Sequence, residues 1–137
     1  DDASHLLGPT EATFSLLFPR LRPGGVYVIE DWSWQHRWAR GIEERVAADP
    51  DGKLATAVAR RVLESEEQAE QPEQPLSRLL LELLIVSGRS PELVVEVVAR
   101  SGWAEVTRGP EQIKGLLDLS SCLGRPAREV LTVREST

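Results

Sequence analysis

The chain of 137 residues contains no methionine, one cysteine, one tyrosine and two phenylalanines. With Cys122 alone, no disulfide can form within the chain. This fits a reducing compartment, so we expect a cytoplasmic location. No apolar run approaches the length of about 18 residues that a membrane-spanning helix needs, so we expect no membrane partner. Because methionine is missing even from the first position, we expect a fragment of a longer protein.

Basic residues are outnumbered by acidic residues. Lysine and arginine together number 16 against 22 acidic residues, which gives a net charge of -6, and Lys53 and Lys114 are the only lysines. A nucleic-acid-binding surface needs a basic stripe, so we expect no nucleic-acid partner. The hydrophobic share of 41% and charged share of 28% are typical of a globular protein, and the length predicts a single domain over residues 1–137.

Near its start the chain predicts a helix followed by a strand. In Gly8–Gly25, Pro9 suits the first turn of a helix, and the apolar residues recur at the spacing of one helix face. Val26–Asp31 is a short β-branched and aromatic run, typical of a buried strand, and it ends in two acids. Together with the opening acids, this pattern predicts half of a βαβ unit whose first strand precedes Asp1.

The rest of the chain predicts helices, a loop and a hairpin. Helices are predicted at Arg40–Ala48, Leu54–Glu66 and Leu76–Gly88. The acidic, proline-containing Ser65–Pro75 (residues 65–75) predicts a flexible loop. The valines of Glu92–Pro110 and the turn at Ser101-Gly102 favour an antiparallel hairpin, and Glu129–Arg134 is a last strand candidate.

The opening stretch DDASH is the first motif with chemical content. If Val26–Ile29 is a parallel strand, a right-handed crossover brings it beside the strand that ends in the opening acids. Both acid clusters then lie at the carboxyl ends of neighbouring strands, about 5 Å apart, where open α/β sheets bind ligands. We therefore predict that Asp2, Glu30 and Asp31 converge on a hard divalent cation, Mg²⁺ first, with Mn²⁺ or Ca²⁺ as alternatives.

His5 follows the first acids and is the predicted general base. An imidazole with an ordinary pKa of about 6.5 takes a proton readily at neutral pH, and a metal lowers the pKa of a bound substrate hydroxyl. Simpler interpretations stay open here, because single acids after strands often serve only as helix caps or loop residues. The tryptophans that follow Asp31 either line a substrate cleft or pack against the protein.

A resemblance to a known family enters with the stretch DDASHLLGPTEATFSLLFPRLRPGGVYVIEDW. It resembles the second half of class I S-adenosylmethionine-dependent methyltransferases, and within them the metal-dependent sugar O-methyltransferases of macrolide tailoring (macrocin and mycinamicin type, also labelled cephalosporin hydroxylase-like). The resemblance implies an α/β, partial Rossmann-like methyltransferase fold: the end of the fourth strand, the fifth strand, helices and a terminal antiparallel β-hairpin. Beyond Trp38 the resemblance is loose.

The resemblance also implies roles for single residues. Asp2, Glu30 and Asp31 are expected to bind Mg²⁺ and His5 to act as the general base. The vicinal hydroxyls of a sugar complete the coordination, and the methyl group passes in line from the sulfonium to an oxygen.

Departures from the family concern the methyl donor. The chain has no G-x-G-x-G loop, so the half of the fold that binds S-adenosylmethionine is absent and no cofactor-binding residue is identified. We expect such a piece to bind the donor poorly, to be inactive alone, and to form a homo-oligomer through Leu76–Gly88. Trp32 and Trp34 are predicted to contact the substrate.

Two functions from different classes follow. The first is a fragment of a Mg²⁺-dependent O-methyltransferase that acts on a hydroxyl of a sugar or other natural-product acceptor in bacterial secondary metabolism. The second is a non-catalytic α/β association module that retains a relic metal site. A metal-dependent hydrolase or hydroxylase is less favoured, because a 2-His-1-carboxylate iron site needs a second histidine near His5 and His36 is badly placed.

Overall fold

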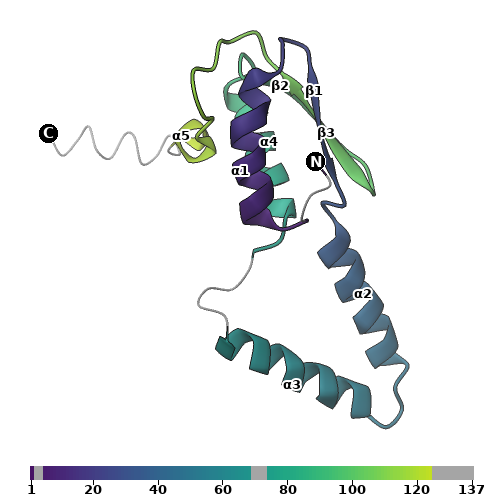
Figure 1. Ribbon diagram of the computed structural model, residues 1–137. Coiled ribbons are helices and arrows are strands. Elements are labelled where there is room, and N and C mark those ends of the chain that lie inside the picture. Colours follow the sequence, from purple (N-terminus) through teal and green to yellow (C-terminus); the bar gives the residue numbers. More distant parts are fainter. Residues whose placement is uncertain (2–4, 69–73, 125–137) are drawn as a thin grey trace, which may run out of the picture.

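Three strands and the helices that cover one of their faces form the body of the chain (Figure 1). The computed structural model describes residues 1, 5–68 and 74–124. β1 (Val26–Glu30), β2 (Val94–Ala99) and β3 (Trp103–Arg108) lie in the order β1-β3-β2, and β3 runs antiparallel to both neighbours. The α/β class is confirmed, as are the first strand and the predicted hairpin of β2 and β3.

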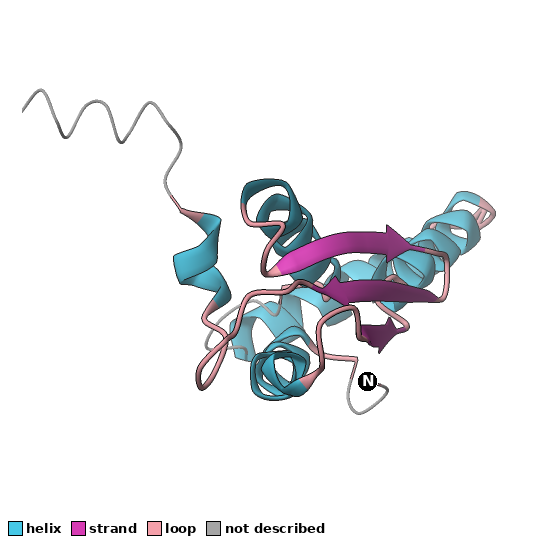
Figure 2. Cartoon of the chain, turned by 90° about the horizontal axis from the view of Figure 1, so that it is seen from above, coloured by secondary structure: helices cyan, strands magenta, loops and turns pink. Residues whose placement is uncertain are grey.

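Two helices pack on the same face of this sheet. α1 (Leu7–Leu17) continues into the short 3₁₀ turn η1 (Phe18–Arg20), and α4 (Ser77–Arg89) lies beside it. Figure 2 shows both helices on one side of the strands. In the core the Phe14 ring stacks on Phe18 with ring centroids 4.5 Å apart. The buried apolar side chains are Phe14, Phe18, Tyr27, Ile29, Leu76, Leu79, Leu80, Leu83, Val86, Val94, Ala104, Val106, Leu117 and Leu119.

The alternation of side chains along β1 explains why only one face is covered. Tyr27 and Ile29 point into the core, while Val26, Val28 and Glu30 point to the opposite face and are exposed. β3 follows the same pattern with Ala104 and Val106 inside. Within the part of the chain that the structure describes, no helix covers this second face, which we call the outer face of the sheet.

α2 (Trp34–Ala47) and α3 (Lys53–Gln68) project from the body as an arm (Figure 1). α2 has no buried residue. At the turn between the two helices, an Asp49 carboxylate oxygen accepts a hydrogen bond from the backbone N–H of Leu54 at 2.7 Å, as expected near a helix N-terminus. The base of the arm is held by Gln35, whose Oε1 accepts from the Leu76 N–H at 3.0 Å.

Some element boundaries differ from those predicted. The second helix begins at Trp34 instead of Arg40, because the Trp34 N–H donates to the Asp31 carbonyl at 2.9 Å and starts the helical turn there. α3 continues to Gln68 and so extends into the segment predicted as a flexible loop, of which residues 69–73 lie outside the described residues. The predicted strand Glu129–Arg134 also lies outside them. α5 (Leu119–Leu123) was not predicted.

Candidate active site

Asp1 lies against the free edge of β1. Its N-terminal amino group donates to the Val28 carbonyl at 2.5 Å, and its carbonyl accepts from the Glu30 N–H at 3.1 Å. Bonds from one residue to the residues on either side of Ile29 are the pattern of a parallel strand pair. The structure therefore brings Asp1 beside the end of β1, next to Glu30.

The side chain of Asp1 is hydrogen-bonded to a core residue of β1. Its Oδ2 accepts a hydrogen bond from the Tyr27 hydroxyl at 2.8 Å. Tyr27 is 8% exposed, and burial raises the pKa of its phenol above the ordinary value of 10.0. The Tyr27 hydroxyl therefore keeps its proton and donates it in the hydrogen bond to the Asp1 carboxylate.

His5 and Asp31 have an unusual backbone conformation. Among the described residues they are the only non-glycine residues with positive φ, 54° for His5 and 49° for Asp31. Such values are uncommon outside glycine, with His, Asp and Asn the usual exceptions, and they cluster at functional sites. Asp31 directly follows β1, and His5 lies two residues before α1.

The two acids after β1 have different surroundings. Glu30 is the last residue of β1, and its side chain is exposed on the outer face. The Asp31 carboxylate instead pairs with the Arg37 guanidinium at 2.6 Å, and its backbone N–H donates to the Gly102 carbonyl at 2.7 Å. Both Asp31 and Arg37 side chains are 46% exposed, so this ion pair contributes little to stability.

The predicted metal set consists of Asp2, Glu30 and Asp31. Asp2 lies outside the described residues, so the complete set is not tested. Within residues 1, 5–68 and 74–124, no group of three or more His, Cys, Asp or Glu side chains is arranged to hold a metal ion. The donor chemistry still fits a hard cation, because Glu30 and Asp31 offer carboxylate oxygens at one strand end.

Trp32 and Trp34, the predicted substrate contacts, use their indole N–H groups within the protein. Trp32 Nε1 donates to the Arg100 carbonyl at 2.7 Å, and Trp34 Nε1 donates to the His5 carbonyl at 2.8 Å. Trp34 also donates its backbone N–H to the Asp31 carbonyl, so Trp34 is bonded to both of the described non-glycine residues with positive φ. Substrate contact through the ring faces of these tryptophans stays a prediction.

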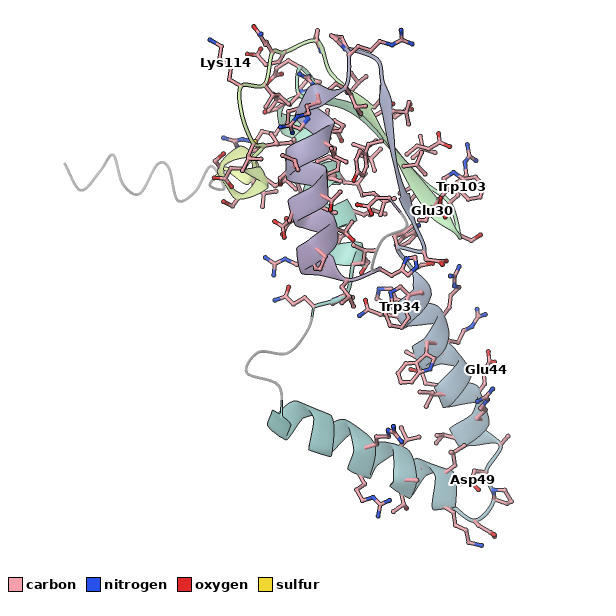
Figure 3. All side chains as sticks on the ribbon, viewed as in Figure 1. Glu30, Trp34, Glu44, Asp49, Trp103 and Lys114 are labelled. Atoms are coloured by element: carbon pink, nitrogen blue, oxygen red, sulfur yellow. The ribbon has the colours of Figure 1, made fainter. Side chains whose placement is uncertain are left out.

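The hairpin turn contributes to the site in a way that the sequence reasoning missed. The Ser101 carbonyl accepts from Ser33 Oγ at 2.7 Å and from Arg37 at 2.9 Å. Next to it, Glu30 and Trp103 face each other as cross-strand partners, and Figure 3 shows their side chains at the same end of the sheet. The sequence does show Trp103 directly after the Ser101-Gly102 turn. Its position beside Glu30, however, follows only from the pairing of β3 with β1.

Comparison with known proteins gives relatives of one type. The chain is 33% identical over 115 residues to an 8-demethyl-8-alpha-L-rhamnosyl tetracenomycin-C 2'-O-methyltransferase of Streptomyces olivaceus, a match that covers 79% of this chain and 28% of the relative. It is 34% identical over 73 residues to an L-olivosyl-oleandolide 3-O-methyltransferase of Streptomyces antibioticus, covering 53% of this chain and 19% of the relative. The resemblance to sugar O-methyltransferases is confirmed.

A third relative matches a short stretch more strongly. The mycinamicin VI 2''-O-methyltransferase of Micromonospora griseorubida is 50% identical over 38 residues, which is 28% of this chain and 9% of the relative. The methyltransferase-like chain thus spans 28% or less of the length of these relatives. No family model matches the chain, and no solved structure matches it. None of the helices in the described ranges is long and apolar enough to cross a membrane.

Proposed function

We propose that this chain is the metal- and acceptor-binding part of an S-adenosylmethionine-dependent O-methyltransferase that acts on a sugar hydroxyl of a natural product. The observation that carries the proposal is the parallel pairing of Asp1, the first residue of the DDASH motif, with β1, which ends in Glu30 and is followed by Asp31. The relatives are all O-methyltransferases by name, two of them of rhamnosyl or olivosyl compounds, and they support the same reaction class.

The topology supports a partial Rossmann-like fold. Asp1, β1 and the antiparallel hairpin β3-β2 lie side by side in the order expected for the end of the fourth strand, the fifth strand and a terminal hairpin. The α1 helix connects Asp1 to β1 as the crossover of a βαβ unit. In this proposal the methyl donor binds to another part of a longer cytoplasmic protein, and the chain alone transfers no methyl group.

The mechanism assigns a role to each acidic residue. Asp2, Glu30 and Asp31 would hold Mg²⁺. Asp1 is level with Ile29, the residue before Glu30, and Asp2 follows Asp1 in the sequence, which supports Asp2 and Glu30 as ligands of one ion. Asp31 would exchange its contact with Arg37 for the ion. When bound, Mg²⁺ lowers the pKa of a coordinated sugar hydroxyl.

His5 would complete the activation of the acceptor. Its imidazole takes the hydroxyl proton while the oxygen forms a bond to the methyl carbon and the carbon–sulfur bond of the donor breaks. The Trp34 indole holds the His5 backbone through the 2.8 Å bond to its carbonyl, which orients this base.

Calorimetry of Mg²⁺ binding to the chain tests the proposal. We expect Asp2→Ala and Glu30→Ala each to weaken Mg²⁺ binding by at least about tenfold, because each variant removes a charged ligand. Glu96→Ala, which removes an exposed glutamate from β2, is the matched control and should bind like the parent. Unaltered Mg²⁺ affinity in both site variants would exclude the metal site.

A second candidate function is association without catalysis. It is favoured by one observation: α4 buries Leu79, Leu83 and Val86 but leaves a second apolar stripe exposed on its other side. That stripe, which we call the outer stripe of α4, consists of Leu81, Leu84 and Ile85. Exposed apolar patches of this kind often mark protein–protein contacts, so the chain would act by forming a homo-oligomer.

A further inference from the structure

The outer face of the sheet contains a hollow at the carboxyl end of β1. It has a volume of about 280 Å³ and is lined by Val28, Glu30, Gly102 and Trp103. Glu30 and Trp103 are cross-strand partners, so their side chains leave the sheet next to each other on the same face. Gly102, which directly precedes Trp103, has no side chain, and a Cβ atom built on it would meet nothing within 4 Å.

Trp103 presents a large, oriented apolar surface to this hollow. The side chain is 42% exposed. Its Nε1 donates to Glu105 at 3.0 Å, and the Arg100 guanidinium carbon lies 6.0 Å from the ring centroid. These two contacts restrain the ring without burying it. By contrast, Trp32 and Trp34 are partly buried and use their indole N–H groups on backbone carbonyls.

The two sides of the hollow match the two kinds of surface on a sugar ring. Aromatic rings provide a flat apolar surface for the C–H groups of a pyranose. A carboxylate accepts hydrogen bonds from hydroxyls, and such bonds are stronger than bonds between neutral groups. The volume is just below the range of about 300–1,000 Å³ typical of pockets for drug-sized ligands, so it suits one sugar ring better than a whole glycoside.

We propose that this hollow, the Trp103 pocket, binds the sugar ring of the acceptor, with the Trp103 indole as the stacking surface and Glu30 as the hydroxyl acceptor. The inference rests on the proposed function, because it names the place where the methylated sugar is held. Since Glu30 also belongs to the proposed metal set, a ring in the pocket would lie next to a residue that would hold the ion.

Saturation-transfer NMR of the chain with methyl α-L-rhamnopyranoside, without Mg²⁺ or methyl donor, tests the pocket. We expect saturation transfer to the ring protons, and Trp103→Ala should weaken binding by about tenfold. Trp38→Ala is the matched control, since Trp38 is more exposed and lies on α2 outside the pocket; it should bind like the parent. Circular dichroism confirms that each variant is folded.

A second variant covers the case in which Trp103→Ala does not fold. Val28→Phe keeps the indole but enlarges a side chain that lines the hollow on the outer face, and it should also reduce the transfer. Absence of transfer with the parent chain, or transfer to Trp103→Ala and Val28→Phe as strong as to the parent, would overturn the inference. Trp103→Ala should retain Mg²⁺ binding in calorimetry, so failure of the sugar pocket and failure of the metal site give different results.

Discussion

At the scale of single residues, Tyr27 connects the core to the start of the chain. Its hydroxyl donates to the Asp1 carboxylate at 2.8 Å, and burial raises the pKa of the phenol above its ordinary value. In the unfolded chain the phenol loses its proton at a pH of about 10, before the folded chain does. The free energy of unfolding therefore falls as the pH rises above that value towards the folded pKa.

We predict that Tyr27→Phe flattens this alkaline loss of stability. At neutral pH the variant should be less stable by about 1 kcal/mol, because one hydrogen bond is lost. Between pH 9 and 11 its Tm should fall less than that of the parent. Tyr27 is the only tyrosine, so the absorbance of the phenolate reports its titration directly. Parallel pH profiles of the parent and the variant would contradict the prediction.

At the scale of elements, the start of α2 joins the two strand ends. Trp34 donates its indole N–H to His5 and its backbone N–H to Asp31. This arrangement bridges two turns that are distant in the sequence and that both contain a residue with positive φ. The first turn of α2 therefore holds two predicted site residues, His5 and Asp31, in position relative to each other.

We predict that Trp34→Phe disturbs His5 while keeping most of the ring volume. The lost hydrogen bond should cost about 1 kcal/mol of stability and shift the NMR signals of the His5 imidazole. The chain has only two histidines, His5 and His36, so only two sets of imidazole signals need to be assigned. Trp38→Phe, on the same helix and 64% exposed, is the control and should leave His5 unchanged. Equal His5 shifts in both variants would argue against the bridge.

α4 offers a matched pair of substitutions for the packing of the core. Leu83 is fully buried, whereas Leu81 on the same helix is 61% exposed. We predict that Leu83→Ala lowers the free energy of unfolding by about 2–5 kcal/mol, because it leaves a cavity, and that Leu81→Ala changes it by no more than about 0.5 kcal/mol. Urea denaturation measures both. A similar cost at the two positions would mean that the helix faces are assigned wrongly.

At the scale of the whole molecule, two surfaces are left without a partner inside the described chain. One is the outer face of the sheet, with Val26, Val28 and Trp103 exposed, and the other is the outer stripe of α4. Each of these two surfaces belongs to one of the two proposed functions. The sheet face carries Glu30 and the Trp103 pocket, whereas the stripe of α4 is the surface proposed for association.

We predict that association, if it occurs through the outer stripe of α4, is abolished by Leu81→Glu combined with Ile85→Glu. Light scattering should then give the mass of a single chain for the double variant and a larger mass for the parent. Both positions are more than half exposed, so the substitutions should preserve the fold. Leu54→Glu on α3 is the control. A parent chain that is monomeric at every concentration would exclude the association function.

Much of the local structure follows from short stretches of sequence. The helix that α1 and η1 form, the apolar strand β1 and the hairpin at Ser101-Gly102 are set by periodicity and turn residues, which act between near neighbours. The DDASH motif with Glu30 and Asp31 likewise identified the type of enzyme that the relatives support. The start of α2 was missed: Ser33 stands at its N-cap position, but its hydroxyl donates to the Ser101 carbonyl and makes no capping bond, and the first turn is set by the bond from Trp34 to Asp31.

Only the tertiary structure decided which of these residues meet. The pairing of β1 with β3 brings Trp103 beside Glu30, and the packing of α2 places Arg37 on Asp31 and Trp34 on His5. Strand register and helix placement depend on burying the whole core at once, so they cannot be derived from any one segment. The sequence by itself determined the chemistry available at the sheet edge; the packed fold decided that Trp103 lies beside it.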